Sequence, residues 1–190
     1  MITLHGDDHF STAHLDLYLV TCDELMALRP HPAPDTVFSD RPFANPYGVL
    51  TNENIPRENR IADVEKNPAN IKWYYRLIVL RETNEVIGSI SFHAPPDENG
   101  MVEIGFGTHQ DFRNHGYGKE ALKAMFTWAC EQPAVKILRY SVGTENAPSQ
   151  AIVQKFNFAH MGVQIDDEDG PEDIYEMSTD EYFSRFVALR

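Results

Sequence analysis

A short glycine-rich segment between an expected strand and an expected helix has the residue types of an anion-binding loop. It comprises Arg113, Asn114, His115, Gly116, Tyr117, Gly118 and Lys119. Glycines let the backbone approach a ligand closely, and the N–H groups of a first helical turn point outward with the positive end of the helix dipole behind them. The basic side chains add positive charge. The segment therefore predicts phosphate binding, and a pyrophosphate would fit; a plain glycine-rich turn is the alternative.

Two nucleotide-binding patterns can be compared with this loop. A P-loop needs glycine at position 113 and serine or threonine at position 120, where the chain has Arg113 and Glu120. The P-loop pattern therefore fails. The relaxed dinucleotide pattern Gly-x-Gly-x-x-Gly/Ala is matched from Gly116 to Ala121, but a polar connection separates it from the preceding strand. A dinucleotide-dependent oxidoreductase stays open as the weaker hypothesis.

The elements around the loop follow from the hydrophobic pattern. A strand is expected over Met101 to Thr108, and apolar residues at helical spacing predict a helix from Tyr117 to Glu131. Ile137 to Val142 has the pattern of a further strand, and Ala147 to Phe156 that of a second helix with Asn146 as a candidate N-cap. A strand, helix, strand unit is therefore expected.

The rest of the chain predicts more strands than helices. Trp73–Arg81 and Val86–His93 form a hairpin pattern that makes three antiparallel strands with the one before the loop. A proline-rich stretch over 30–60 is expected to be an acceptor-side loop or lid. The other expected elements are a strand over 14–20, helices over 23–29 and 57–66, and a last hairpin over 160–165 and 174–177.

Length and composition set broad limits. The 190 residues suit a single domain, 1–190, with residues 1–11 expected to be flexible. No apolar run approaches the roughly 20 residues of a membrane span, and no secretory signal starts the chain, so a cytoplasmic protein is expected. The net charge of −13 argues against nucleic acid and favours a cationic substrate. The spacing of His5 and His9 could hold a metal on a helix, but we predict no metal.

The motif Arg113-x-x-Gly116-x-Gly118 resembles the signature Gln/Arg-x-x-Gly-x-Gly/Ala, which follows a β-strand in the GNAT superfamily of N-acetyltransferases. The wider segment from Val102 to Leu122 is similar to the branch of the family that acetylates the N-termini of ribosomal proteins. Glu145–Ser149 is a later match to the family. The family usually has glycine where Asn157 stands, and asparagine tolerates the left-handed conformation after a helix. The resemblance implies a mixed α/β fold: a mostly antiparallel sheet of six to seven strands, splayed beside Met101–Thr108, with helices on both faces.

The resemblance also implies acetyl-CoA as acyl donor. The pantetheine arm would pair with the backbone of Phe106, Gly107 and Thr108, and the loop from Asn114 to Lys119 would hold the pyrophosphate. Asn146 would reach the pantetheine, or simply cap its helix.

Two catalytic roles follow from this mechanism. A mostly protonated amine needs a base, for which Glu103 is the first candidate; an ordinary cross-strand ion pair is the alternative. The family commonly has a tyrosine, here replaced by Val153, that protonates the leaving thiolate. Ser149 could donate instead, or cap its own helix turn. Tyr140 and Tyr175 remain possible donors.

The sequence gives less information about the acceptor than about the cofactor. Acidic residues of the last hairpin could attract an ammonium group or form a solvated turn; they are Asp166–Asp169, Glu172 and Asp173. Phe38, Phe43 and Tyr47 could line an acceptor pocket or anchor the lid. The expected activity is direct transfer, in a ternary complex, to a small amine or a peptide N-terminus. A silent acyl-CoA-binding module is the alternative, and a monomer or homodimer is expected.

Overall fold

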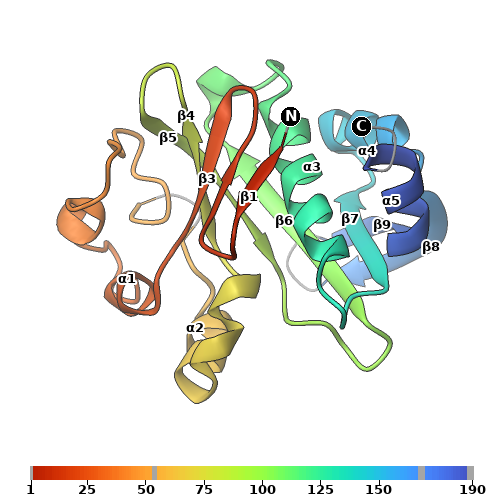
Figure 1. Cartoon of the computed structure of the whole chain (residues 1–190), viewed down its shortest axis with the longest axis horizontal. Helices are drawn as coiled ribbons and strands as arrows, with labels where there is room; N and C mark the ends of the chain where they lie inside the picture. The colour runs from red at the N-terminus through yellow and green to blue at the C-terminus, as the bar shows by residue number, and fades with distance from the viewer. Residues whose placement is uncertain (1, 53–54, 167–169, 188–190) are drawn as a thin grey trace. The chain divides into compact units, whose positions relative to one another are not determined.

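A computed structural model describes residues 2–52, 55–166 and 170–187 of the chain (Figure 1). The chain divides into two compact units. The first comprises Met1–His93 and Phe106–Ala124, and the second Ala94–Gly105 and Met125–Arg190. Strand β6 (Met101–Thr108) and helix α3 (Tyr117–Cys130) each run from one unit into the other. The expected single domain stays a prediction.

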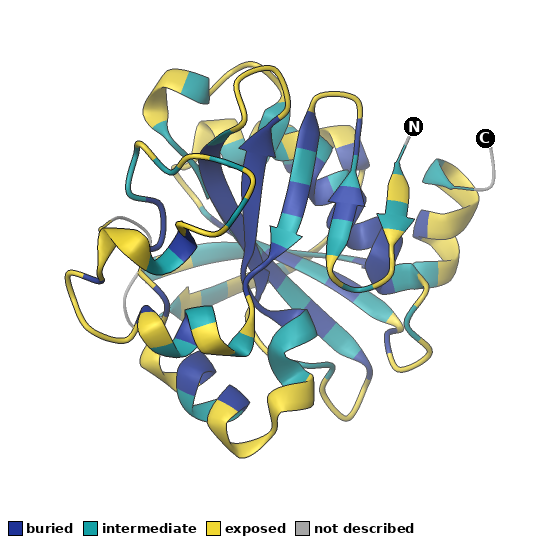
Figure 2. Cartoon of the chain, turned by 60° about the vertical axis from the view of Figure 1, so that its left-hand side comes forward, coloured by how far each residue is buried: buried dark blue, intermediate teal, exposed yellow. Residues whose placement is uncertain are grey.

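The first unit contains an antiparallel run of five strands: β1 (Thr3–His5), β2 (His9–Ser11), β3 (Leu15–Leu19), β4 (Arg76–Leu80) and β5 (Glu85–Phe92). The leucines of β3 alternate with polar residues and are buried, which is the period-2 pattern of a strand with one covered face. By contrast, β4 is buried along its whole length (Figure 2). The end of β6 lies beside β5 in this unit.

Most helices of the first unit lie between β3 and β4. They are α1 (Cys22–Ala27), the 3-10 helix η1 (Asp35–Phe38), α2 (Glu58–Lys66) and the 3-10 helix η2 (Pro68–Trp73). A further 3-10 helix, η3 (Gln110–Phe112), lies before α3. A capping box between Thr21 and Glu24 starts α1 because each side chain bonds the other's backbone N–H. Leu25 of α1 and Ile61 and Val64 of α2 pack in one core with residues of β4 and β5.

The second unit is built around β7 (Ile137–Gly143). The start of β6 pairs with β7 in parallel, in the register Met101–Ile137 to Glu103–Arg139. On the other side, β9 (Gly170–Ser178) pairs with β7 and β8 (Ala159–Asp166) with β9, both antiparallel. Helices α4 (Ala147–Phe156) and α5 (Thr179–Phe186) complete the unit, with an aromatic cluster formed by Phe126, Phe156, Phe158 and Tyr182.

The expected fold class is confirmed: a mixed α/β chain with one mostly antiparallel sheet. The strand order is β1-β2-β3-β4-β5-β6-β7-β9-β8, so the described residues form a sheet of nine strands rather than six to seven. The difference comes from β1 and β2, which lie where a flexible segment was expected. Each of these strands has three residues, which is too short to show the alternating hydrophobic pattern of a strand. Asp16 of β3 holds β2 in place by accepting hydrogen bonds from Ser11 at 2.6 Å and His9 at 3.0 Å.

Helix α5 was also missed from the sequence. Ser178 is its N-cap and accepts a hydrogen bond from the backbone N–H of Glu181 at 3.2 Å. A serine followed three residues later by a glutamate is the pattern that could have predicted this start. No helix in the described ranges is long and apolar enough to cross a membrane.

Candidate functional site

The loop before α3 leaves its backbone N–H groups open. Asn114 and Gly116 both have left-handed backbones, with φ of 65° and 86°. At the start of α3, the first backbone N–H group that has a backbone acceptor is that of Glu120. It donates to the carbonyl oxygen of Gly116 at 3.0 Å. Within the described part of the chain, the N–H groups from Asn114 to Lys119 have no backbone acceptor. These are the donors that a bound phosphate would use.

Two glycines of the loop are needed for different reasons. A Cβ at Gly116 would meet nothing within 4 Å, so this side of the loop is open. A Cβ at Gly118 would lie 2.5 Å from Cε2 of Phe106, so the first turn of α3 packs directly on β6. In addition, a Cβ at Gly88 would lie 2.2 Å from the carbonyl oxygen of Gly107. The loop, Phe106 and Gly107 are therefore brought together in the first unit.

The basic side chains of the loop stay close to it. Nε of Arg113 donates to the carbonyl of Thr108 at 3.3 Å, which ties the loop to the end of β6. Nδ1 of His115 donates to the carbonyl of Arg113 at 2.8 Å, and its ring stacks on Tyr117 at 5.6 Å. Lys119 is exposed. Open N–H groups with nearby cations fit a pyrophosphate.

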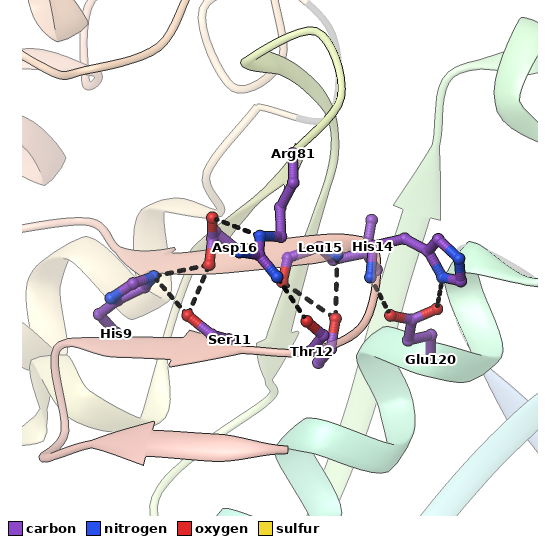
Figure 3. Close-up of polar contacts among 8 residues, drawn as sticks. All are labelled: His9, Ser11, Thr12, His14, Leu15, Asp16, Arg81 and Glu120. Atoms are coloured by element: carbon purple, nitrogen blue, oxygen red, sulfur yellow. Dashed lines mark hydrogen bonds and ion pairs between the residues drawn. The ribbon is translucent and has the colours of Figure 1, made fainter. Parts of the chain in front are cut away.

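A second anchor of this helix start was missed from the sequence. Glu120 accepts hydrogen bonds from the backbone N–H of His14 at 2.8 Å and from its Nδ1 at 2.9 Å (Figure 3). Burial raises the pKa of the Glu120 carboxyl, but hydrogen bonds from Thr12 and His14 outweigh this effect and leave the pKa below its ordinary value. The turn between β2 and β3 is thus tied to the first turn of α3.

The proposed base lies in the second unit. Glu103 is half-buried on β6, and its register partner on β7 is Arg139. Arg139 donates from Nε to Glu176 of β9 at 2.8 Å. The guanidinium beside Glu103 therefore already has a carboxylate partner, and both interpretations of Glu103 stay open.

The start of α4 brings three of the predicted residues together. Asn146 is the N-cap, and its Oδ1 accepts a hydrogen bond from the backbone N–H of Ser149 at 3.2 Å. The hydroxyl of Ser149 forms a hydrogen bond with that of Tyr140 on β7. Burial raises the pKa of Tyr140 to about 12, and the hydrogen bond from Ser149 offsets part of this rise. Asn146 thus caps the helix, and the Ser149 side chain is directed to Tyr140.

The other candidate donors are differently placed. Val153 is 2% exposed in the core of the second unit, so α4 has no polar group at the position of the family's tyrosine. The hydroxyl of Tyr175 donates to Oε1 of Gln150 at 2.7 Å. Among the three hydroxyl groups considered, those of Ser149 and Tyr140 form one pair, and that of Tyr175 has a separate partner.

The aromatic residues of the 30–60 stretch contact the rest of their unit. Phe38 is buried, Phe43 packs on Tyr18 with ring centroids 5.2 Å apart, and Tyr47 stacks on His109 at 4.3 Å. These contacts favour an anchoring role over that of a pocket lining.

Two of the acidic residues of the last hairpin have partners within it. Asp173 accepts from His160 at 2.7 Å, and Glu172 accepts from Gln164 at 3.0 Å. The predicted acidic residues at 167–169 lie outside the described residues.

Solved structures share this fold. The ribosomal-protein-S5-alanine acetyltransferase from Vibrio fischeri superposes with a TM-score of 0.63 at 11% identity, covering 92% of this chain and 98% of that one. RimL, a ribosomal L7/L12 alpha-N-protein acetyltransferase in complex with coenzyme A, has a TM-score of 0.58 at 17% identity, covering 88% and 95%. At these identities the likeness shows the fold alone.

Comparison with other sequences and with family models gives the family. The uncharacterized N-acetyltransferase YjdG of Bacillus subtilis (strain 168) is 35% identical over 82 residues, which are 43% of this chain and 49% of that protein. The chain spans about half the length of the first curated relatives it matches. Residues 23–159 match the model of the acetyltransferase (GNAT) domain, which is more than half of the chain. The chain therefore belongs to the GNAT acetyltransferase family.

Proposed function

We propose that this protein is an acyl-CoA-dependent N-acetyltransferase. It transfers an acetyl group from acetyl-CoA to a primary amine of a small molecule or of a peptide or protein N-terminus. The observation that carries the proposal is the loop before α3, whose open N–H groups, open face at Gly116 and neighbouring cations suit the pyrophosphate of coenzyme A. The ribosomal-protein acetyltransferases among its structural neighbours support an amine acceptor on a protein.

The cofactor residues form two groups in this proposal. In the first unit, the N–H groups from Asn114 to Lys119 bind the pyrophosphate, and Arg113 supports the loop through Thr108. The backbone of Phe106–Thr108 pairs with the pantetheine arm. In the second unit, Asn146 uses only its Oδ1 in the helix cap, so its amide Nδ2 is the group that would donate to the pantetheine.

The amine must lose a proton before it attacks. Acetyl-CoA supplies an activated thioester carbon, which the amine attacks directly in a ternary complex. At neutral pH an ordinary amine is mostly protonated, so Glu103 accepts its proton, directly or through water. Glu103 lies on β6, three residues before the segment Phe106–Thr108 that is proposed to pair with the pantetheine arm.

The leaving thiolate needs a hydrogen-bond donor. Ser149 takes this role, because it is the hydroxyl at the start of α4 and Asn146 already provides the cap. Tyr140, which is 7% exposed, is its hydrogen-bond partner. A serine hydroxyl has one hydrogen, so in the reaction Tyr140 donates to Ser149, and the Ser149 O–H turns to the thiolate. In this proposal the hydroxyl groups of Ser149 and Tyr140 take the role of the family's tyrosine, whose position is occupied by Val153.

A silent acyl-CoA-binding module is the second candidate. The observation in its favour is Val153, which is buried and apolar where the family commonly has its acid. Such a module would bind coenzyme A and release no thiol from acetyl-CoA with any amine.

The test is thiol release from acetyl-CoA with polyamines, aminoglycosides, amino acids and short peptides as acceptors. The wild type is compared with Glu103→Gln and Ser149→Ala, and with Glu98→Gln as an exposed control on the turn before β6. We expect release with one acceptor class. Glu103→Gln should lower kcat by about 10²- to 10⁴-fold, the usual contribution of a general base. Ser149→Ala should lower kcat with an unchanged KM for acetyl-CoA.

Three results would change the proposal. Full activity of both variants would remove the two roles and leave the enzyme. Calorimetric binding of acetyl-CoA without release would favour the silent module, and absence of binding would exclude both functions. A cationic acceptor, a monomer or homodimer, a cytoplasmic location and no nucleic-acid or membrane partner remain part of the proposal.

A further inference from the structure

A buried arginine lies in the first unit outside the residues discussed so far. Arg60 is in the first turn of α2 and is 8% exposed. Its Nη1 donates to Oγ of Ser91 on β5 at 3.0 Å, and its guanidinium carbon lies 5.2 Å from the centre of the Tyr75 ring. Ser91 in turn donates to the carbonyl of Phe92 at 2.7 Å. The neighbours of this cation are therefore a hydroxyl and an aromatic ring.

The charge of Arg60 has no carboxylate partner within the described residues. Asp63, three positions further along the helix, is occupied: its Oδ2 accepts from Tyr74 at 2.6 Å and from Asn70 at 2.8 Å. Burying a cation without an anion is costly, because the low-dielectric interior replaces the water that solvated it. A buried cation without an anionic partner is therefore a candidate binding site for an anionic group of a ligand.

One edge of the guanidinium has no hydrogen-bond partner among the described residues. Nη1 is used by Ser91, whereas Nε is buried without a hydrogen-bond partner. Nη2 also makes no hydrogen bond to the described residues. The N–H groups of Nε and Nη2 are parallel on one edge and match the two oxygens of a carboxylate, which accepts both at once.

The position of Ser91 relates this edge to the cofactor strand. Ser91 lies three residues along β5 from Gly88, the residue in closest approach to Gly107. At about 3.4 Å per residue, the separation along the strand is about 10 Å. Arg60 and the strand proposed to hold the pantetheine arm therefore belong to the same part of the first unit.

We propose that Arg60 binds a carboxylate of the acceptor, so that the preferred acceptor is an amine that also carries a carboxylate. This inference rests on the proposed function and names its substrate class. The carboxylate has two sources: the α-carboxylate of an amino acid or short peptide, or an acidic side chain near a peptide N-terminus. Tyr75 covers the guanidinium, and Ser91 fixes its orientation.

The experiment compares acceptors that differ only in this group. The first pair is Ala-Ala and Ala-Ala-amide, and the second is Ala-Asp-amide and Ala-Asn-amide, so each pair tests one source. In the wild type, the carboxylate member of one pair should have a KM about 10- to 100-fold lower, as expected for hydrogen bonds to a charged group. Equal KM values within both pairs would overturn the proposal.

The variants are Arg60→Met, Arg60→Lys and, as a control on the exposed end of α2, Lys66→Met. Arg60→Met should abolish the preference and leave the KM for acetyl-CoA unchanged. Arg60→Lys retains the charge without the paired donors and should lose most of the preference, which gives a result even if the methionine variant does not fold. Lys66→Met should behave as the wild type. A preference that persists in Arg60→Lys and Arg60→Met would also overturn the proposal.

Calorimetry with the same peptides, without acetyl-CoA, separates this inference from the proposed function. Binding that prefers the carboxylate and needs Arg60, without thiol release, would retain the anion site and reject the acetyl transfer. Thiol release with equal use of both members of each pair would retain the transferase and reject the anion site.

Discussion

Gly118 shows how the absence of one side chain shapes the helix start. A Cβ there would lie 2.5 Å from Cε2 and 3.1 Å from Cζ of Phe106, so the ring would have to move. Since the backbone of Phe106 is proposed to pair with the pantetheine arm, we expect Gly118→Ala to raise the KM for acetyl-CoA about tenfold, which is about 1.4 kcal/mol. Steady-state kinetics at saturating acceptor measure this change.

The Phe106→Leu/Gly118→Ala double variant is the matched control for steric conflict. A smaller side chain at position 106 should restore part of the affinity for acetyl-CoA. If the double variant is as impaired as Gly118→Ala, the clash with Phe106 is not the cause. Gly143→Ala, whose new Cβ would meet only an ordinary contact at 3.9 Å, should change neither KM nor stability.

The site residues that the sequence could predict are neighbours along the chain. The loop from Arg113 to Lys119 carries its own signal, since glycine, basic residues and a helix start occur within seven positions. The contact between His14 and Glu120 spans 106 positions, and that between Arg60 and Ser91 spans 31. No local pattern indicates such pairs, because they depend on which elements the fold packs together.

At the level of elements, Glu120 connects the turn before β3 to the first turn of α3 (Figure 3). Its pKa is lower in the folded chain than the ordinary value of about 4.3, so it contributes stability above that pH. This contribution is lost as the pH falls through the lower, folded-state pKa. We expect Glu120→Gln to cost about 1–3 kcal/mol of unfolding free energy at pH 7 and progressively less below about pH 4.

Urea unfolding of both proteins between pH 3 and pH 7 measures this difference. If the difference in unfolding free energy between the wild type and Glu120→Gln stays constant from pH 3 to pH 7, the negative charge of Glu120 does not contribute to stability. The variant should also raise the KM for acetyl-CoA if the anchored turn helps to hold the loop before α3.

The elements predicted best are those with a strong period or a cap. Helix α4 has the expected bounds, and Asn157 after it has the expected left-handed backbone, with φ of 55° and ψ of 46°. The sequence predicts β5, β6 and β7 within one residue of their observed ends. It does not predict β1 and β2, which depend on pairing with β3, nor the length of the β6–β7 pairing, which is set by register.

At the scale of the whole molecule, the net charge acts on a ligand at long range, before any specific contact forms. The net charge of −13 creates a negative potential that attracts cations over roughly a Debye length, about 10 Å at 0.1 M salt. The basic loop is a local exception. A carboxylate-bearing acceptor with extra lysines would therefore be attracted by the surface as a whole and bound at its anion by one arginine.

We accordingly expect ionic strength to distinguish two acceptor peptides with the same first two residues, one followed by two lysines and the other by two glutamines. At saturating acetyl-CoA and low salt, the lysine peptide should have the higher kcat/KM, because the negative potential increases its rate of encounter. Raising the salt concentration from about 20 mM to about 500 mM shortens the Debye length to a few ångströms and should remove most of this advantage. The glutamine peptide reports any effect of salt on the enzyme itself. A lysine-to-glutamine ratio of kcat/KM that does not change with salt would show that the acidic surface serves another purpose, such as solubility.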